Sequence, residues 1–276
     1  MEKDQTDNPA RPAPVRLAFC VSYLGSRFFG SQMQAESRTV EGEFIAACLR
    51  LSLFEDWRKA GFTSAGRTDR GVHARGQVIV FSTLQPERAV QTINTQLPPD
   101  CWCTAYAEVP DSFHPRYDAR SRTYRYFFAD PPGDPAAMDR AARQFTGTHN
   151  FSNYARVGDK NPERTILAAQ VRSEEGFLFF EVTGHSFLWH QVRCMAAALL
   201  AVGAGQAPED SVTRLLEGPA DRALTPAPAE GLILWETDCG IAWTPLAARD
   251  RSTRFMDHLT SHHALMEKIC RTLNSP

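Results

Sequence analysis

One loop of the sequence combines residue types that could act as a nucleophile or a base. Asp69 lies between Gly66 and Gly71, two positions at which the backbone can turn tightly. Arg67 and Arg70 flank the aspartate, and nearby guanidinium groups favour the ionised form of a carboxylate. An ionised carboxylate suits nucleophilic attack or proton abstraction rather than proton donation. The alternative is a surface turn with a charged tip, because turns often gather glycine, aspartate and arginine.

A second candidate is a lone cation in the most apolar segment of the chain. Residues 187–202 predict a helix that is apolar on nearly every side, and Arg193 lies on it one turn after His190. An unpaired buried guanidinium costs on the order of several kcal/mol, so we expect a carboxylate or a phosphate from outside the helix to meet Arg193. The alternative is an arginine that reaches water at a helix end, but a long apolar stretch follows it.

A third candidate is a segment in which arginines alternate with aromatic residues. If residues 120–128 are extended, one face of the strand carries Arg120, Arg122, Tyr124, Tyr126 and Phe128. Cations bind phosphates and aromatic rings stack on bases, so this pattern indicates a strand that faces RNA. The alternative is an edge strand with ordinary cross-strand aromatic pairs and solvated arginines.

Strands and helices interleave along the chain without the strict alternation of a parallel sheet. Apolar and β-branched runs predict strands at residues 15–21, 77–83, 101–109, 120–129, 164–172, 177–183 and 231–236. Helical spacing of apolar residues predicts helices at residues 40–51, 86–97, 135–145, 187–202 and 208–216. Because hairpins are frequent, the sequence favours an α+β fold with a mixed, mainly antiparallel sheet.

The chain divides into four predicted parts. Residues 1–14 form a flexible tail, residues 15–112 an N-terminal α/β subdomain that carries the Asp69 loop, residues 113–245 a C-terminal α/β subdomain, and residues 246–276 a helical extension. The two subdomains have similar lengths and similar orders of elements. This similarity indicates a duplicated unit with a cleft between the copies.

The composition and net charge of the chain exclude several classes of protein. The chain has 276 residues, 43% of them hydrophobic, and a formal net charge of -2. It can bury a large core, but it is not the basic body of a non-specific nucleic-acid binder, so any polyanion must meet a local patch. No apolar run is long enough for a membrane helix, and we expect a cytoplasmic protein with no membrane partner. The seven cysteines lack paired spacing, which predicts reduced thiols rather than a zinc site.

Together these segments resemble the motifs of the TruA family of tRNA pseudouridine synthases. Four stretches are similar, in family order, to its catalytic loop, tyrosine motif, arginine helix and C-terminal strand motif: residues 65–78, 120–126, 186–205 and 227–232. Between the second and third motifs, residues 145–156 and 161–166 also match, and the similarity extends from about residue 15 to about residue 236. The forms LWHQVRCM and NPERTI are closer to archaeal and eukaryotic members, whereas Gln191 and Arg70 depart from the common pattern.

The resemblance implies the pseudouridine synthase fold, in which two α/β subdomains share the sheet around a central active-site cleft. It implies that Asp69 is the catalytic carboxylate, that Tyr124 stacks on the target base and assists removal of its C5 proton, and that Arg193 forms an ion pair with Asp69. Leu232 would pack under the carboxylate. Arg67 would occupy the space that the flipped nucleotide leaves.

Further contacts and partners follow from the same resemblance. We expect substrate-binding contributions from His73, which would shape the loop, and from Arg122 and Tyr126. The substrate would be the anticodon arm of tRNA, at positions 38, 39 and/or 40, and the enzyme would be a homodimer whose two clefts bind one tRNA. The reaction would require no cofactor and no metal.

The implied chemistry suits a single carboxylate. Pseudouridylation breaks the N1–C1′ bond, rotates the detached uracil, joins C5 to C1′ and removes the C5 proton. One aspartate can attack C1′ or take the C2′ proton while a closed pocket retains the uracil, and the sequence leaves both roles open. One alternative is an RNA-binding module with the same fold and no activity. A metal-dependent hydrolase is a weaker alternative, because His185 and His190 lack ligand spacing.

Overall fold

The computed structural model describes residues 13–129, 133–220, 224–246 and 250–274. Its strands in these segments are β1 (Val15–Tyr23), β2 (Thr63–Ser64), β3 (His73–Thr83), β4 (Cys101–Glu108), β5 (Ser121–Phe127), β6 (Gly147–Asn150), β7 (Glu163–Glu174), β8 (Phe177–Gly184), β9 (Leu232–Asp238) and β10 (Thr244–Pro245). The helices are α1 (Val40–Arg50), α2 (Pro86–Gln96), α3 (Pro135–Arg143), α4 (Gln191–Gly203), α5 (Ser211–Glu217) and α6 (Asp250–Leu273), and three short 3-10 turns are η1 (Gly25–Arg27), η2 (Ser152–Tyr154) and η3 (Ala229–Gly231).

The strands form one sheet that runs through the molecule. Its order is β10-β4-β1-β3-β9-β5-β8-β7-β6, with β2 paired to β3 outside this path. In the described part of the chain, every pair of neighbouring strands is antiparallel except β3 and β9. The expected α+β fold with a mixed, mainly antiparallel sheet is therefore confirmed.

The single parallel pair lies in the middle of the sheet and joins its two halves. His73 pairs with Ile233 and Ala74 with Leu234, so the first residues of β3 and of β9 meet at the same edge. The loop that carries Asp69 immediately precedes β3. This arrangement places that loop beside Leu232, the first residue of β9.

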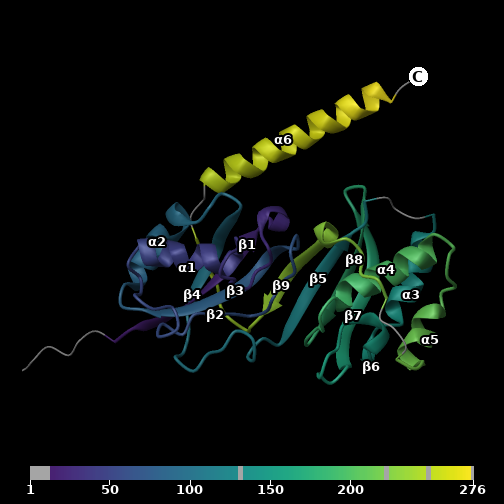
Figure 1. The fold of residues 1–276 in the computed structure, drawn as a ribbon, viewed down its shortest axis with the longest axis horizontal. Coiled ribbons are helices and arrows are strands. Elements are labelled where there is room, and N and C mark those ends of the chain that lie inside the picture. Colours follow the sequence, from purple (N-terminus) through teal and green to yellow (C-terminus); the bar gives the residue numbers. More distant parts are fainter. Residues whose placement is uncertain (1–12, 130–132, 221–223, 247–249, 275–276) are drawn as a thin grey trace, which may run out of the picture.

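The helices cover the two halves of the sheet as separate groups. Figure 1 shows α1 and α2 beside β1 to β4, and α3, α4 and α5 beside β5 to β8. In the first group, Phe44 of α1 and Ile93 of α2 are fully buried against Phe19 and Phe81, whose rings stack with centroids 5.5 Å apart. In the second group, α3 and α4 pack on each other and α3 on β7. Each half thus has a core of its own.

Local signals in the sequence set several element boundaries. The Thr39 hydroxyl accepts a hydrogen bond from the backbone of Gly42 and caps α1, and Pro86 begins α2. β7 and β8 form the expected hairpin. Its two turn residues, Glu175 and Gly176, both have positive φ angles, of 51° and 83°, which matches the twist of paired strands.

The helix expected over residues 187–202 begins later than the apolar pattern indicated. Helix α4 starts at Gln191, and His190 before it has a left-handed backbone with φ of 65°. The Gln191 side chain accepts a hydrogen bond from the backbone of Leu188 at 2.8 Å and closes this turn. Arg193 therefore lies in the first turn of the helix and His190 directly before it, and both side chains reach Asp69.

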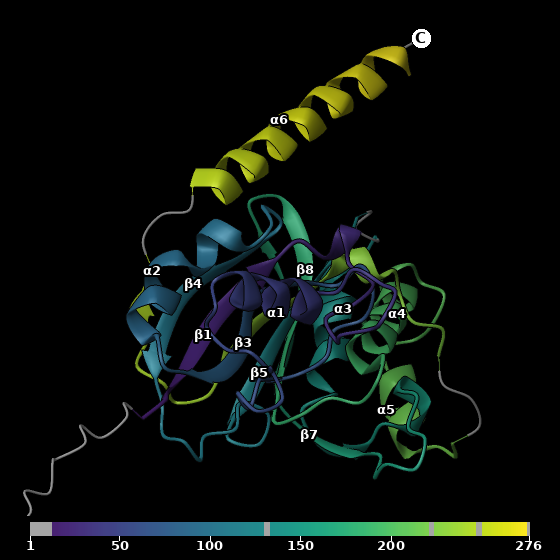
Figure 2. The same cartoon turned by 60° about the vertical axis from the view of Figure 1, so that its left-hand side comes forward.

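The terminal segments differ in what the structure describes. The tail expected at residues 1–14 lies outside the described residues except for its last two. The helical extension is present as α6, which extends away from the sheet in Figure 2. Among the helices of the described segments, none has the length and apolar character needed to span a membrane.

The subdomain boundary between residues 112 and 113 stays a prediction.

Candidate active site

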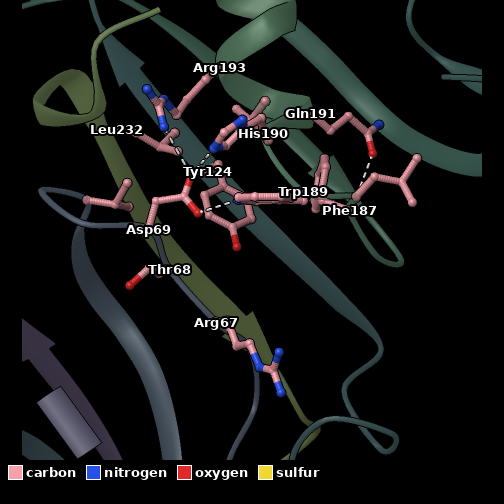
Figure 3. Close-up of a pocket in the computed structure, with 13 residues that line it drawn as sticks. Arg67, Thr68, Asp69, Tyr124, Phe187, Trp189, His190, Gln191, Arg193 and Leu232 are labelled. Carbon is pink, nitrogen blue, oxygen red and sulfur yellow. Dashed lines mark hydrogen bonds and ion pairs between the residues drawn. The ribbon is translucent and has the colours of Figure 1, made fainter. Parts of the chain in front are cut away.

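A small pocket lies where the Asp69 loop, β5, β9 and the start of α4 meet. It encloses about 70 Å³. In Figure 3, Asp69 lies between Trp189 on one side and Arg193 on the other, with the Tyr124 ring beside it. Leu232 also lines the pocket and is 6% exposed. The topology thus brings together an acid, a cation and an aromatic ring from distant parts of the sequence.

The Asp69 carboxylate is held through both of its oxygens. Arg193 Nη1 lies 3.1 Å from Oδ2 in an ion pair, and His190 Nε2 lies 3.3 Å from the same oxygen. The Trp189 indole donates a hydrogen bond to Oδ1 at 3.0 Å. The side chains of Arg193 and His190 are 14% and 12% exposed, and that of Asp69 is 27% exposed. The expected ion pair between Asp69 and Arg193 is confirmed, and the partner of Arg193 is a carboxylate.

Arg193 is fixed by the backbone as well as by Asp69. Its Nε donates to the carbonyl oxygen of Ala227 at 2.7 Å, and the Ala227 amide donates back to the Arg193 carbonyl at 3.1 Å. Its place in the first turn of α4 puts Asp69 near the helix N-terminus, where the partial positive charge also favours an anion. The segment before β9 and the start of α4 therefore position the guanidinium together.

His190 contacts Asp69 as a neutral imidazole. Burial and the positive charge of Arg193 lower the pKa of His190, although the Asp69 carboxylate opposes this shift. Its Nδ1 is buried and has no hydrogen-bond partner among the described residues, so the proton belongs on Nε2, which faces Asp69. The left-handed backbone at His190 is of the kind that accumulates at functional sites.

The Asp69 loop is shaped by one of its two candidate glycines. Gly71 has a φ of 83°, and the amide of Val72 donates to the Asp69 carbonyl to close the turn. Gly66 has no positive φ, and a Cβ there would meet no atom within 4 Å. The conformational freedom of glycine is thus used at Gly71 and not at Gly66.

The cation that pairs with Asp69 is neither of the two arginines that flank it in the sequence. Arg70 places its guanidinium carbon 4.3 Å from the centre of the Phe29 ring. Arg67 is exposed at the edge of the pocket and points away from Asp69 in Figure 3. In the described part of the chain, no hydrogen bond or ion pair links either arginine to Asp69. The positive charge comes instead from Arg193.

Tyr124 lies in β5 and lines the pocket. Its ring meets that of Phe187 edge-on, with centroids 5.1 Å apart. Burial raises the pKa of Tyr124 to about 12, so its hydroxyl stays protonated at neutral pH. Tyr124 also packs against both cores, which fixes the position of the ring at the junction of the two halves.

The strand expected to face RNA lies inside the sheet. β5 pairs with β8 on one side and with β9 on the other, with a bulge between Thr123 and Tyr124 in its pairing with β9. The edge-strand alternative is therefore wrong, whereas the proposal that one face of the strand meets RNA stays a prediction. Tyr126 is 3% exposed and packs in the core, so its ring cannot meet a base that arrives from solvent.

Arg122 and His73 support the frame of the pocket rather than line it. Arg122 donates to the backbone carbonyls of His185, Arg116 and Ala65 at 2.7, 2.7 and 3.2 Å. His73 accepts a hydrogen bond from the Gly25 amide through Nδ1, and its Nε2 lies 3.1 Å from the Glu230 carbonyl.

The two contacts of His73 indicate the protonation state of its ring as well as holding it in place. Nδ1 must carry a lone pair to accept from an amide, so the ring is neutral with its proton on Nε2. Burial lowers the pKa of His73, in agreement with this state. The expectation that His73 shapes the loop agrees with these contacts, whereas direct substrate contact from His73 or Arg122 has no support in the pocket lining.

Sequence reasoning assigned no role to Trp189 or Phe187, both of which line the pocket. Their position in the apolar segment just before Arg193 could have indicated a place in the site, but the apolar pattern predicts helix there. Within the described segments, no group of three or more histidine, cysteine, aspartate or glutamate side chains is arranged to hold a metal ion.

Comparison with known proteins identifies the family. A family model described as tRNA pseudouridine synthase matches residues 19–118 and 141–238. A protein named tRNA pseudouridine synthase A from Methanoculleus marisnigri is 57% identical over 92% of this chain and 94% of its own length. Proteins of the same name from Methanosphaerula palustris and Methanocorpusculum labreanum are 54% and 46% identical, over 94% and 84% of this chain and 93% and 83% of their own lengths. These relatives are archaeal, in line with the resemblance of the motifs, and the chain belongs to the TruA family of tRNA pseudouridine synthases, enzymes that isomerise uridine in tRNA.

Proposed function

We propose that the enzyme converts uridine to pseudouridine in the anticodon stem-loop of tRNA, at positions 38, 39 and/or 40, with Asp69 as the nucleophile or base. The observation that supports this assignment most directly is the 3.1 Å ion pair between Asp69 and Arg193 on the wall of a pocket that Tyr124 also lines. The pair orients the carboxylate, which both candidate roles of Asp69 require.

In this proposal, one Asp69 oxygen reacts with the ribose. It attacks C1′, or it takes the C2′ proton, and the N1–C1′ bond breaks with its electron pair on uracil. The uracil anion rotates in the pocket and C5 bonds to C1′, as the Asp69–C1′ bond breaks in the first route or as Asp69 returns the proton to C2′ in the second. The C5 proton then passes to a base and N1 takes up a proton, so no proton is gained or lost overall. The reaction consumes no water. A pocket that excludes water therefore permits the reaction and protects the intermediate from hydrolysis.

Tyr124 would hold the uracil by stacking and assist removal of the C5 proton. A hydroxyl whose pKa is about 12 is a poor source of phenolate at neutral pH, so the neutral hydroxyl would orient the proton transfer rather than act as a strong base. The edge contact with Phe187 limits rotation of the ring. Leu232 would pack under the Asp69 carboxylate.

The target nucleotide would be extruded from the anticodon arm into the pocket. Enzymes that act on a base inside a helix must flip it out of the stack. Arg67 is exposed at the pocket edge and would occupy the vacated space in the RNA. We also propose that two copies of the chain act as a homodimer in the cytoplasm, because joint binding by two clefts would compensate for a net charge near zero.

The test of this proposal is Asp69→Ala with Asp257→Ala as the control, because Asp257 is exposed on α6. Pseudouridine at positions 38, 39 and 40 is mapped by mass spectrometry on tRNA incubated with each variant, and tRNA binding is measured separately. We expect Asp69→Ala to form no pseudouridine while its Kd for tRNA stays within about threefold of wild type. Wild-type turnover in this variant would remove Asp69 from the mechanism, and product at other positions only would contradict the proposed target.

A further inference from the structure

The pocket that contains Asp69 is too small, as it stands, to enclose the target base. It encloses about 70 Å³, whereas a dry protein cavity that admits benzene measures about 150 Å³. Uracil has a six-membered ring and two exocyclic oxygens in addition. For the pocket to enclose the base, at least one side chain that lines it would have to move.

Several apolar side chains of the pocket wall are buried, whereas the Trp189 indole is exposed and is held by its hydrogen bond to Asp69 and a ring contact with His190. Leu188, Val192 and Leu232 are each no more than 6% exposed and belong to the core. Trp189 is 53% exposed, the largest exposed fraction among the apolar residues of the wall. Its backbone is held by a hydrogen bond from the Arg156 amide to its carbonyl at 3.0 Å, so the indole can rotate while the chain stays in place.

The two oxygens of Asp69 differ in how firmly they are held. Oδ2 contacts Arg193 and His190, whose side chains are largely buried. Among the described residues, Oδ1 has one hydrogen-bond donor, the half-exposed Trp189 indole at 3.0 Å. Each carboxylate oxygen has about two lone-pair sites, so Oδ1 keeps one beside the Trp189 contact, but a donated hydrogen bond makes the oxygen less reactive toward the ribose. Oδ1 is the oxygen that can be released without disturbing the ion pair with Arg193.

We propose that Trp189 is a further active-site residue, which holds Asp69 Oδ1 in the free enzyme and yields that oxygen to the ribose of the incoming uridine. The proposal rests on Asp69 as the reacting carboxylate. Rotation of the indole out of the wall frees Oδ1 and enlarges the pocket in the same movement. The indole surface then lies at the pocket edge, beside the guanidinium of Arg156, whose carbon is 5.0 Å from the ring centre in the free enzyme.

Trp189→Phe tests this role because it keeps an aromatic ring and removes the N–H donor. If the contact breaks before chemistry, its loss cannot slow the chemical step. We expect the single-turnover rate at saturating tRNA to stay within about twofold of wild type and the half-saturating concentration to fall about two- to fivefold, since the free enzyme no longer has a contact to break. An unchanged half-saturating concentration would contradict the proposal. A rate that falls tenfold or more would overturn the proposal, because the indole N–H would then be needed during the reaction.

Movement of the indole is tested by tryptophan fluorescence. The matched control is Trp235→Phe, because the Trp235 ring lies outside the pocket between the guanidinium groups of Arg75 and Arg125. We expect tRNA binding to change the emission of wild type and of Trp235→Phe, and this change to be absent in Trp189→Phe. An identical change in Trp189→Phe would overturn the proposal, since the indole would then keep its surroundings.

The failure of this proposal and that of the proposed function give different results. Turnover by Asp69→Ala would show that Asp69 is not the reacting carboxylate, and both proposals would then be wrong. If Asp69→Ala forms no product and Trp189→Phe loses most of its rate, Asp69 keeps its role and only the release of Oδ1 by Trp189 is wrong.

Discussion

The Arg193 guanidinium lies 3.1 Å from the Asp69 carboxylate, although 124 residues separate the two along the chain. Asp69 precedes β3 in one half of the sheet, and Arg193 begins α4 in the other half. The parallel pairing of β3 with β9 brings the two halves together at this point. The ion pair therefore forms only when both halves are folded and docked on each other.

We expect Arg193→Met to impair catalysis far more than tRNA binding. Methionine preserves the apolar packing of the side chain but removes the charge that orients Asp69, so kcat should fall about 100-fold, or about 2.7 kcal/mol in activation free energy. The Kd for tRNA should stay within about threefold. Single-turnover rates and filter binding measure the two quantities, with Arg254→Met as the control because that side chain is 82% exposed on α6. Equal losses in rate and affinity would show that Arg193 binds a phosphate.

The need of Arg193 for an anion was predictable from sequence, but the structure of its surroundings was not. A lone cation among apolar residues requires a counter-charge wherever it lies, and the sequence left carboxylate and phosphate open. The start of α4 was misplaced because residues 187–190 are as apolar as the helix. The features that set the start of α4 are local, namely the hydrogen bond between Gln191 and Leu188 and the left-handed backbone of His190, and an apolar pattern does not indicate them.

The sequence pattern of β5 was also an incomplete guide to its surroundings. Alternation along a strand shows which residues share a face, but it does not show whether both edges of the strand are paired. Arg122 and Tyr126 were expected to meet RNA, but Arg122 donates to three backbone carbonyls and Tyr126 is buried in the core. Tyr124 keeps access to the pocket because it lies at the junction of the two cores, where the bulge shifts its register with β9.

Gly71→Ala should destabilise the fold and disturb the Asp69 loop. The residue has a φ of 83°, and an added Cβ would lie 3.3 Å from the Cβ of Ala229. A left-handed backbone costs an L-residue roughly 1–2 kcal/mol, so we expect a loss of this size in urea unfolding together with a lower kcat. Gly66→Ala in the same loop is the control and should change the free energy of unfolding by less than about 0.5 kcal/mol. Equal effects at both glycines would mean that φ is not the cause.

Stability should fall as the pH decreases below neutrality, partly through His73. Burial lowers the pKa of His73 in the folded state, so the unfolded chain binds the proton more readily. The contribution of His73 is therefore full above the unfolded pKa, near 6.5, and is lost as the pH falls through the lower folded value. The Gly25 amide then faces a protonated Nδ1 in place of a lone pair.

Asparagine at position 73 separates this titration from the structural contact. Its side-chain oxygen can accept from the Gly25 amide as Nδ1 does, but it does not titrate. We expect His73→Asn to show a smaller loss of unfolding free energy than wild type between pH 7.5 and 5. His190, whose pKa is also lowered, remains in both proteins and contributes with the same sign. Identical pH dependence in the two proteins would assign the effect to other groups.

Tyr124→Phe should separate the stacking role of the ring from the role of its hydroxyl. Phenylalanine keeps the edge contact with Phe187 and the surface on which uracil would stack, so the Kd for tRNA should not change. Proton transfers assisted by a side chain contribute about 100-fold or more, and a neutral hydroxyl belongs at the low end of that range. We therefore expect kcat to fall between about 10- and 100-fold.

Tyr124→Ala removes the ring as well, and its additional defect measures stacking. Loss of an aromatic platform costs about 1–3 kcal/mol per base, so this variant should bind tRNA more weakly than Tyr124→Phe if the extruded base contributes to affinity. Tyr106→Phe on β4 is the control, since Tyr106 does not line the Asp69 pocket. If Tyr124→Phe turned over at the wild-type rate while Tyr124→Ala did not, the hydroxyl would take no part in removing the C5 proton. Another group near the Asp69 pocket would then have to accept that proton.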